Sequence, residues 1–329
     1  MAKIFVTRRI PGNALDELSS SGHEVIVSEY DRPLNADEFL ERGKGSDALL
    51  TLLTDVINGE VIDAMGPQLK IISNYAVGFD NIEIADATTK GVVVTNTPSD
   101  EVSESVAEHT IALVLAIFNR IVEADRVVRQ GGYNGWNPDI FMGGNLTGKT
   151  FGIIGLGRIG TTVARRLVGF EMKIIYTKRS RDEEAEKKLG LVYATLESLL
   201  AESDVISLHV PLTSETRHMI NKDTLAKIKR GAVLVNTSRG SVIDEGDLAA
   251  ALRDGQLGGA ALDVYDNEPN INPELINMDN TVLTPHIASA THEARDKMGQ
   301  QAVTAILDVL AGKMPENIVN KEVWPARRH

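Results

Sequence analysis

The 329-residue sequence contains no cysteine, and this absence excludes several classes of protein. Without a thiol the chain forms no disulfide, holds no metal through thiolates and uses no cysteine nucleophile. Aromatic residues make up only 5% of the chain. No apolar run approaches the roughly 18 residues of a membrane-spanning helix. The first twelve residues carry charge where a secretory signal would need an apolar core, so we expect a cytoplasmic protein without a membrane partner.

Positive charge is also in short supply. Lysine and arginine number 34 against 46 aspartates and glutamates, which gives a formal net charge of −12. This balance argues against nucleic acid as a partner, because a phosphate backbone attracts basic surfaces. At about 100–200 residues per domain, the length predicts two domains, each long enough to bury a core.

Short apolar stretches alternate with helical patterns along the chain. The first series of expected strands covers 3–7, 24–28, 47–53, 70–73 and 92–95, with helices such as 13–20 and 82–90 between them. The second series begins at 151 and continues near 173–177, 204–208, 232–236, 259–263 and 281–284. Such alternation predicts an α/β protein with two doubly wound parallel sheets. A helix at 291–310 follows, and the tail returns to the first domain.

Residues 151–160, FGIIGLGRIG, combine a buried strand with Gly155, Gly157 and Gly160 ahead of a helical pattern. Gly155 permits a tight turn, Gly157 lets the backbone approach a pyrophosphate, and Gly160 lets helix and strand pack closely. The start of the helix then faces the anion. The motif therefore predicts a dinucleotide site, although an ordinary tight turn between strand and helix would also explain the three glycines.

The longest helical pattern runs from about residue 100 to 130 and ends at Gly131 and Gly132. Ser105 and Glu108 have the spacing of a capping box, and the pattern is apolar nearly all round at 111–118, which favours an interdomain or subunit contact. Residues 131–148 lack periodicity and are rich in glycine, which indicates an arm. Trp136 in this arm is either an interface anchor or a side chain packed on its own domain.

Three polar side chains follow expected strands of the second series, namely Arg239, Glu268 and His286. Each alone has an ordinary explanation: a surface cation, a turn residue before proline, a loop histidine. Ligands of open parallel sheets bind beyond the carboxyl ends of the strands. The joint occurrence of the three beside a dinucleotide turn therefore predicts a catalytic site.

Six segments together carry a specific resemblance over almost the whole chain. They are NYAVGFDNIE (74–83), GIIGLGRIG (152–160), HVPLTSETRHMI (209–220), NTSRGSVID (236–244), ALDVYDNEP (261–269) and TPHIASATHEAR (284–295). The sequence resembles the D-isomer-specific 2-hydroxyacid dehydrogenases, and within them the glyoxylate/hydroxypyruvate reductases. Ala288 departs from the glycine that relatives usually have, which would tighten the nicotinamide side of the pocket.

The resemblance implies a division of the chain and a homodimer. A Rossmann cofactor domain (100–286) would be inserted into a flavodoxin-like substrate domain (1–99 and 287–329). The helix and arm at about 100–148 would form the subunit contact. The cofactor contacts implied are Gly155, Leu156, Gly157, Arg158, Ile159, Gly160, Lys178, Arg179, Ser180, His209, Val210, Pro211, Thr237, Ser238, Arg239, Asp263, His286 and Ala288. In particular, Asp263 would hold the nicotinamide amide.

The resemblance also implies the reduction of a small 2-oxo acid to a 2-hydroxy acid. His286 is suited to donate a proton near neutral pH, and a neighbouring Glu268 would favour its charged form. Arg239 presents a planar fork of donors that fits a carboxylate. The substrate contacts implied are Leu53, Ala76, Val77, Gly78, Trp136, Arg239 and Ser289, with backbone N–H groups at 76–78 and with Leu53 and Trp136 limiting substrate size.

The end of the strand at 173–177 bears on the choice of cofactor. NAD-binding relatives carry an acid at the position of Lys178, where a carboxylate would bond the ribose hydroxyls. Here Lys178, Arg179, Ser180 and Arg181 form a cationic stretch. It predicts a 2′-phosphate site, hence NADPH preferred and NADH usable. Alternatively, the charges are merely solvated, with Arg181 paired to Glu183 or Glu184.

Other functions stay open at this stage. A D-lactate or other small 2-oxo acid reductase has the same catalytic residues. A phosphoglycerate dehydrogenase is disfavoured by the absence of room for a regulatory domain, and a corepressor of this fold by the absence of long disordered extensions. The histidines have no metal-site spacing, such as an H-E-x-x-H pattern, so no metal is expected.

Overall fold

The computed structural model describes residues 1–328, which form two compact units. The first unit comprises residues 1–102 and the chain from 290 onward, and the second comprises residues 103–289. The second unit is thus an insertion in the chain of the first. The sequence placed these boundaries three residues earlier, at 99/100 and 286/287.

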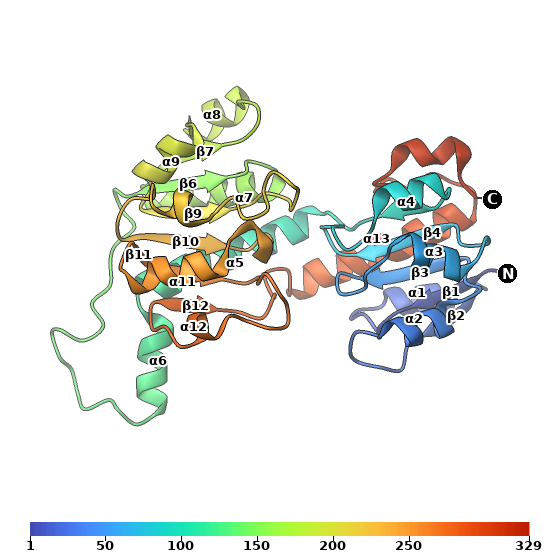
Figure 1. The fold of residues 1–329 in the computed structure, drawn as a ribbon, viewed down its shortest axis with the longest axis horizontal. Coiled ribbons are helices and arrows are strands. Elements are labelled where there is room, and N and C mark those ends of the chain that lie inside the picture. Colours follow the sequence, from blue (N-terminus) through green and yellow to red (C-terminus); the bar gives the residue numbers. More distant parts are fainter. Residues whose placement is uncertain (329) are drawn as a thin grey trace. The chain divides into compact units, whose positions relative to one another are not determined.

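The first unit contains a five-stranded parallel sheet in the order β2-β1-β3-β4-β5 (Figure 1). This is the flavodoxin-like order. The strands are β1 (Lys3–Val6), β2 (Glu24–Val27), β3 (Ala48–Leu52), β4 (Ile71–Tyr75) and β5 (Val93–Thr95). The helices are α1 (Ala14–Ser19), α2 (Ala36–Gly43), α3 (Gly59–Met65), α4 (Ile84–Thr89) and α13 (His292–Leu310), followed by the 3₁₀ helix η3 (Lys321–Ala326).

The second unit contains a seven-stranded parallel sheet in the order β12-β11-β10-β9-β6-β7-β8. Counted from β6, this is the Rossmann order with a seventh strand. The strands are β6 (Thr150–Ile154), β7 (Lys173–Thr177), β8 (Val192–Tyr193), β9 (Val205–Leu208), β10 (Ala232–Asn236), β11 (Leu257–Leu262) and β12 (Thr281–Leu283). The helices are α5 (Asp100–Phe118), which starts in the first unit, α6 (Ile121–Arg129), α7 (Arg158–Leu167), α8 (Glu183–Leu189), α9 (Leu196–Glu202), α10 (Lys222–Leu225), α11 (Glu245–Arg253) and α12 (Pro273–Ile276), with 3₁₀ turns η1 (Val168–Phe170) and η2 (Gly240–Val242).

The fold class expected from the sequence is confirmed: both sheets are parallel and doubly wound. In the second unit, alternate side chains of β6 enter two different cores. Phe151 and Ile153 pack on one face of the sheet, whereas Ile154 packs on the other. Because both faces of the sheet are covered, its strands are continuous runs of apolar residues. Such runs can be recognised in the sequence, which is why these strands were predicted.

The prediction of one continuous helix at 100–130 was wrong. The helix breaks between Phe118 and Ile121, where Arg120 adopts a left-handed conformation with φ 53°. The carbonyl of Phe118 accepts a hydrogen bond from the N–H of Gly144 at 3.0 Å, so it is not available for the next hydrogen bond of the helix. The second segment ends at Arg129, just before the glycines that the sequence identified as its stop.

The predicted capping box at Ser105 and Glu108 was also wrong, because both residues lie inside α5. The Ser105 hydroxyl donates to the carbonyl of Ala288 at 2.8 Å. Glu108 forms an ion pair with Arg166 of α7 at 2.8 Å. Both side chains therefore hold α5 to other parts of the second unit rather than capping it.

The arm at 131–148 contains no helix or strand, as expected, and projects with α6 away from the sheet of the second unit (Figure 1). Trp136 leaves 84% of its surface exposed. It is therefore not packed on its own domain, which was one of the two interpretations of this residue.

Candidate active site

The glycine turn after β6 has the geometry that its sequence predicts. Gly155 adopts φ 98°, and a Cβ atom there would overlap the carbonyl of His209. A Cβ atom at Gly160 would overlap the carbonyl of Gly155, so α7 packs closely on the turn. By contrast, a Cβ atom at Gly157 would meet no atom within 4 Å. Gly157 caps α7 without a side-chain hydrogen bond. The open side of Gly157 and the start of α7 fit a dinucleotide pyrophosphate.

His286 and Glu268 follow the neighbouring strands β12 and β11, and their side chains meet. Nδ1 of His286 lies 2.9 Å from Oε2 of Glu268. The other carboxylate oxygen of Glu268 accepts the N–H of Tyr265 at 3.0 Å. Burial would raise the pKa of Glu268, but the hydrogen bond to His286 and the charges of His286 and Arg239 outweigh it, and the pKa lies below its usual value.

Arg239 follows β10, the strand next to β11, and is half-buried. Its Nη1 donates to the carbonyl of Ser238 at 2.8 Å. Its own carbonyl accepts from the Asn236 side chain at 2.8 Å. The second unit therefore brings Arg239, Glu268 and His286 to the ends of three adjacent strands, although their catalytic roles stay predictions.

Asp263 at the end of β11 fixes the loop that carries His286. Its carbonyl accepts the N–H of His286 at 2.9 Å, and its two carboxylate oxygens accept the N–H groups of Ile287 and Ala288 at 2.9 and 2.8 Å. Three consecutive N–H groups thus converge on one residue. They hold His286 in a left-handed conformation, φ 54°, that a non-glycine residue rarely adopts.

His109 of α5 is also part of this arrangement. Its Nε2 lies 3.1 Å from the Thr284 hydroxyl and 3.5 Å from Oδ1 of Asp263. The Thr284 hydroxyl donates to that same oxygen at 2.6 Å. Burial would raise the pKa of Asp263, but these hydrogen bonds and the two backbone N–H groups outweigh it and hold the pKa low. The Asp263 side chain is fully buried, and its expected contact with nicotinamide stays a prediction.

The cations after β7 all have carboxylate partners. Arg179 pairs with Glu215 at 2.8 Å, and Lys178 pairs with Asp182 at 3.1 Å. Arg181 makes three hydrogen bonds to Glu186, at 2.7–3.1 Å. The structure thus corrects the alternative partners, Glu183 and Glu184, that the sequence suggested. The Arg179 side chain remains 83% exposed, so an incoming anion can reach it.

Other expected cofactor contacts lie on loops of the same sheet edge. Burial lowers the pKa of His209 to about 4, and its Nε2 lies 2.9 Å from the Ser207 hydroxyl, so the ring is neutral near pH 7. The Thr237 hydroxyl lies 3.0 Å from that of Thr110. Leu156 and Ala288 are buried, whereas Arg158, Ser180 and Pro211 are exposed and Ile159, Val210, Ser238 and Ser289 are partly exposed.

The remaining expected substrate contacts belong to the first unit. Leu53 directly follows β3 and is 36% exposed. In the loop after β4, the N–H of Ala76 donates to the carbonyl of Asn74 at 2.8 Å, so this group already has an acceptor. The side chains of Asn96 and Asn74 donate to the carbonyls of Val77 and Gly78 at 2.6 and 3.0 Å. Contacts of these residues with a substrate stay predictions.

The model of the D-isomer-specific 2-hydroxyacid dehydrogenase NAD-binding domain matches residues 111–288, more than half of the chain. The chain belongs to this family. It is 46% identical to a glyoxylate reductase of Thermococcus litoralis, covering 98% of this chain and 97% of that protein.

Solved structures agree. A glyoxylate reductase from Paecilomyes thermophila superposes with a TM-score of 0.86 and 31% identity, over 98% of this chain and 99% of that one. An NADPH-dependent glyoxylate/hydroxypyruvate reductase from Sinorhizobium meliloti, in complex with NADP and malonate, has a TM-score of 0.86 and 32% identity, over 100% and 99% of the two chains.

The family assignment and the glycine turn together establish a nicotinamide dinucleotide as the cofactor of this oxidoreductase. Among residues 1–328, no helix is long and apolar enough to cross a membrane. Within the same described range, no group of three or more histidine, aspartate or glutamate side chains could hold a metal ion.

Proposed function

We propose that this protein reduces glyoxylate to glycolate, and hydroxypyruvate to D-glycerate, with a reduced nicotinamide cofactor. The observation that carries the proposal is the 2.9 Å contact of His286 with Glu268 on strand ends of the sheet that bears the glycine turn. The names of relatives that are similar along their full length point to the same substrates.

Three side chains divide the chemistry. Arg239 binds the substrate carboxylate and polarises the neighbouring carbonyl group. Glu268 orients the His286 ring through its contact with Nδ1. The other ring nitrogen of His286, Nε2, donates a proton to the carbonyl oxygen. The bound reduced nicotinamide supplies a hydride to the carbonyl carbon.

We further propose NADPH as the preferred cofactor and a homodimer as the working assembly. Arg179 and Ser180 would contact the 2′-phosphate, with Lys178 or Arg181 in support. The exposed apolar side chains of α6 and Trp136 of the arm would lie in the subunit contact. A cytoplasmic location stays a prediction from the sequence.

Steady-state kinetics with glyoxylate, hydroxypyruvate, pyruvate and 3-phosphohydroxypyruvate, each with NADPH and NADH, test this proposal. We expect glyoxylate or hydroxypyruvate to give the highest kcat/KM. His286→Ala protein prepared in parallel controls for contaminating reductases. A kcat/KM for pyruvate or 3-phosphohydroxypyruvate about tenfold above that for glyoxylate, a difference of roughly 1.4 kcal/mol in transition-state binding, would overturn the proposal.

A further inference from the structure

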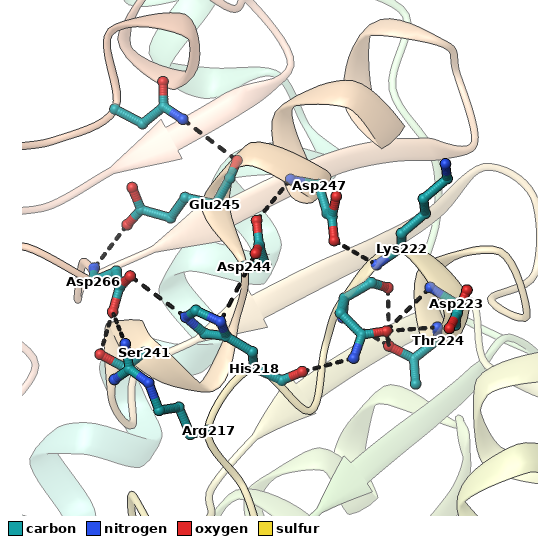
Figure 2. A network of polar contacts seen from close by, with 12 residues as sticks. Arg217, His218, Lys222, Asp223, Thr224, Ser241, Asp244, Glu245, Asp247 and Asp266 are labelled. Atoms are coloured by element: carbon teal, nitrogen blue, oxygen red, sulfur yellow. Dashed lines mark hydrogen bonds and ion pairs between the residues drawn. The ribbon is translucent and has the colours of Figure 1, made fainter.

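Two side chains join the loops that carry Arg239 and Glu268. Ser241 lies two residues after Arg239, and Asp266 lies two residues before Glu268. The Ser241 hydroxyl donates a hydrogen bond to Oδ1 of Asp266 (Figure 2). Gly240 packs so closely on the other loop that a Cβ atom there would overlap the backbone of Tyr265. A close backbone contact and a side-chain hydrogen bond thus both join the two loops.

Asp266 is held from several sides in Figure 2. Nε2 of His218 lies 3.5 Å from its Oδ2, and the Arg217 guanidinium lies 3.9 Å from its Oδ1. The N–H of Asp266 donates to the Glu245 carboxylate at 2.8 Å. The other ring nitrogen of His218 lies 3.8 Å from Asp244, which caps α11. The loop of Glu268 is thus tied both to the loop of Arg239 and to the start of α11.

We propose that Ser241 and Asp266 are positioning residues that set the placement of Arg239 relative to Glu268, and through Glu268 that of His286. They act through the backbone of the two loops. The proposal deepens the proposed function, on which its kinetic readout rests. Because catalysis depends on near-attack geometry, a displacement of about 1 Å lowers the rate substantially.

Three variants test the pair: Ser241→Ala, Asp266→Ala and the double variant. Each single change is expected to lower kcat/KM for glyoxylate about tenfold, within the range of up to about 100-fold that such a displacement costs. The double variant should fall no further than the worse single variant, because both changes remove the same contact. Ser241→Thr keeps the hydroxyl, and its kcat/KM should stay within about twofold of wild type. This result would show that the loss in Ser241→Ala comes from the hydrogen bond rather than from unfolding.

Asp247→Ala is the matched control. Asp247 belongs to the same polar network, but its Oδ2 accepts the N–H of Lys222 at 2.7 Å and so joins α11 to α10 (Figure 2). This variant should keep wild-type kcat/KM. Wild-type kinetics in Ser241→Ala and Asp266→Ala, or losses that multiply in the double variant, would overturn the proposal.

Hydrogen exchange separates this proposal from the proposed function. The N–H of Tyr265 donates to Glu268 and reports on the loop without any substrate. It should exchange about tenfold faster in Ser241→Ala and Asp266→Ala than in wild type and Asp247→Ala, because local opening costs less free energy. A wild-type protein that reduces no 2-oxo acid refutes the proposed function alone. Unchanged exchange at Tyr265 refutes the positioning pair, whatever the activity.

Discussion

Nδ1 of His286 and Oε2 of Glu268 lie 2.9 Å apart, on loops that follow the two neighbouring strands β12 and β11. The contact assigns the two ring nitrogens different tasks, because Nδ1 binds the carboxylate and Nε2 is left for a substrate. Asp263 supports this pair, because it accepts hydrogen bonds from the three successive N–H groups of residues 286–288. The proposed acid catalyst is therefore preorganised by hydrogen bonds within the second unit.

Replacing His286 with alanine should lower kcat for glyoxylate by about 10²- to 10⁴-fold, the usual contribution of a positioned general acid. Cofactor affinity, measured by nicotinamide fluorescence, should survive, because the glycine turn is untouched. Glu268→Gln should lower kcat less, since glutamine still accepts a hydrogen bond but carries no charge. A folded, cofactor-bound His286→Ala enzyme that kept more than about a tenth of wild-type turnover would remove His286 from this role.

Asp263→Asn should destabilise the second unit by about 1–3 kcal/mol at pH 7, because the amide NH₂ leaves a buried backbone N–H without an acceptor. The pKa of Asp263 is lower in the folded protein than its ordinary value of about 3.9, so the carboxylate stabilises the fold above that pH. This stabilisation is lost as the pH falls through the depressed pKa.

Urea unfolding of wild type and Asp263→Asn at several pH values measures this difference. The gap between the two proteins should be constant near neutral pH and shrink below about pH 4. Asp254→Asn, which changes an exposed carboxylate on the same unit, should show no such gap. A gap that widens on acidification would contradict the sign of the shift.

The helices and strands of the second unit could be predicted where the residues of the element itself carry a clear hydrophobic pattern. The strands β7 and β10 occupy the predicted residues, because their apolar runs are buried on both faces of a parallel sheet. The two-residue edge strand β8, half exposed, has no such run and was missed. The break at Arg120 was missed too, since it depends on a hydrogen bond from Gly144 in a distant arm.

The residues of the candidate site also fall into two groups: those that the sequence could predict and those that only the folded structure brings together. That Arg239, Glu268 and His286 lie at one sheet edge could be predicted, because each lies in a loop after a strand and the ends of parallel strands meet at one edge. Their catalytic roles stay predictions. His109 could not, since it lies in the middle of a largely apolar helix and its partner Asp263 is far along the chain. Likewise, Ser241 and Asp266 lie in segments that were recognised, but only the folded loops show that they meet.

Trp136 and Leu53 are predicted to restrict the substrate to two- and three-carbon 2-oxo acids. Wild type should therefore reduce phenylpyruvate poorly, and Trp136→Ala should raise kcat/KM for phenylpyruvate relative to glyoxylate about tenfold or more. Tyr133→Ala changes another exposed aromatic residue of the same arm and should leave this ratio unchanged. Wild-type protein that reduced phenylpyruvate as efficiently as glyoxylate would refute the size restriction.

The apolar surface of α6 is predicted to lie in a homodimer contact. Ile121, Val122 and Val128 expose 52%, 40% and 58% of their surfaces. Val128→Glu should shift the protein from dimer to monomer in sedimentation-velocity experiments, because an interface core tolerates no unpaired charge. Arg129→Glu, a charge change on the adjacent residue, should leave the dimer intact. Sedimentation of wild type as a monomer at micromolar concentration would contradict the prediction.

Arg179 is predicted to bind the 2′-phosphate of NADPH. Its ion pair with Glu215 allows a second test of this prediction. The ion pair joins two exposed side chains, and such pairs contribute little to stability, so a phosphate can replace the carboxylate. Arg179→Ala should weaken NADPH use about 10- to 100-fold, the effect of one charge-assisted hydrogen bond, and leave NADH kinetics nearly unchanged.

Glu215→Gln provides the opposite change. It leaves Arg179 without its competing carboxylate and removes a negative charge from the phosphate site, so kcat/KM for NADPH should rise relative to NADH. Arg253→Ala is the matched control, because Arg253 is another exposed arginine paired with a carboxylate, Glu274, and it lies at the end of α11 and outside the proposed phosphate site. Its effect on the cofactor ratio should stay within about twofold, well below the loss of a phosphate contact. A wild-type enzyme that favours NADH, or an Arg179→Ala variant that loses both cofactors equally, would show that these cations do not bind the 2′-phosphate.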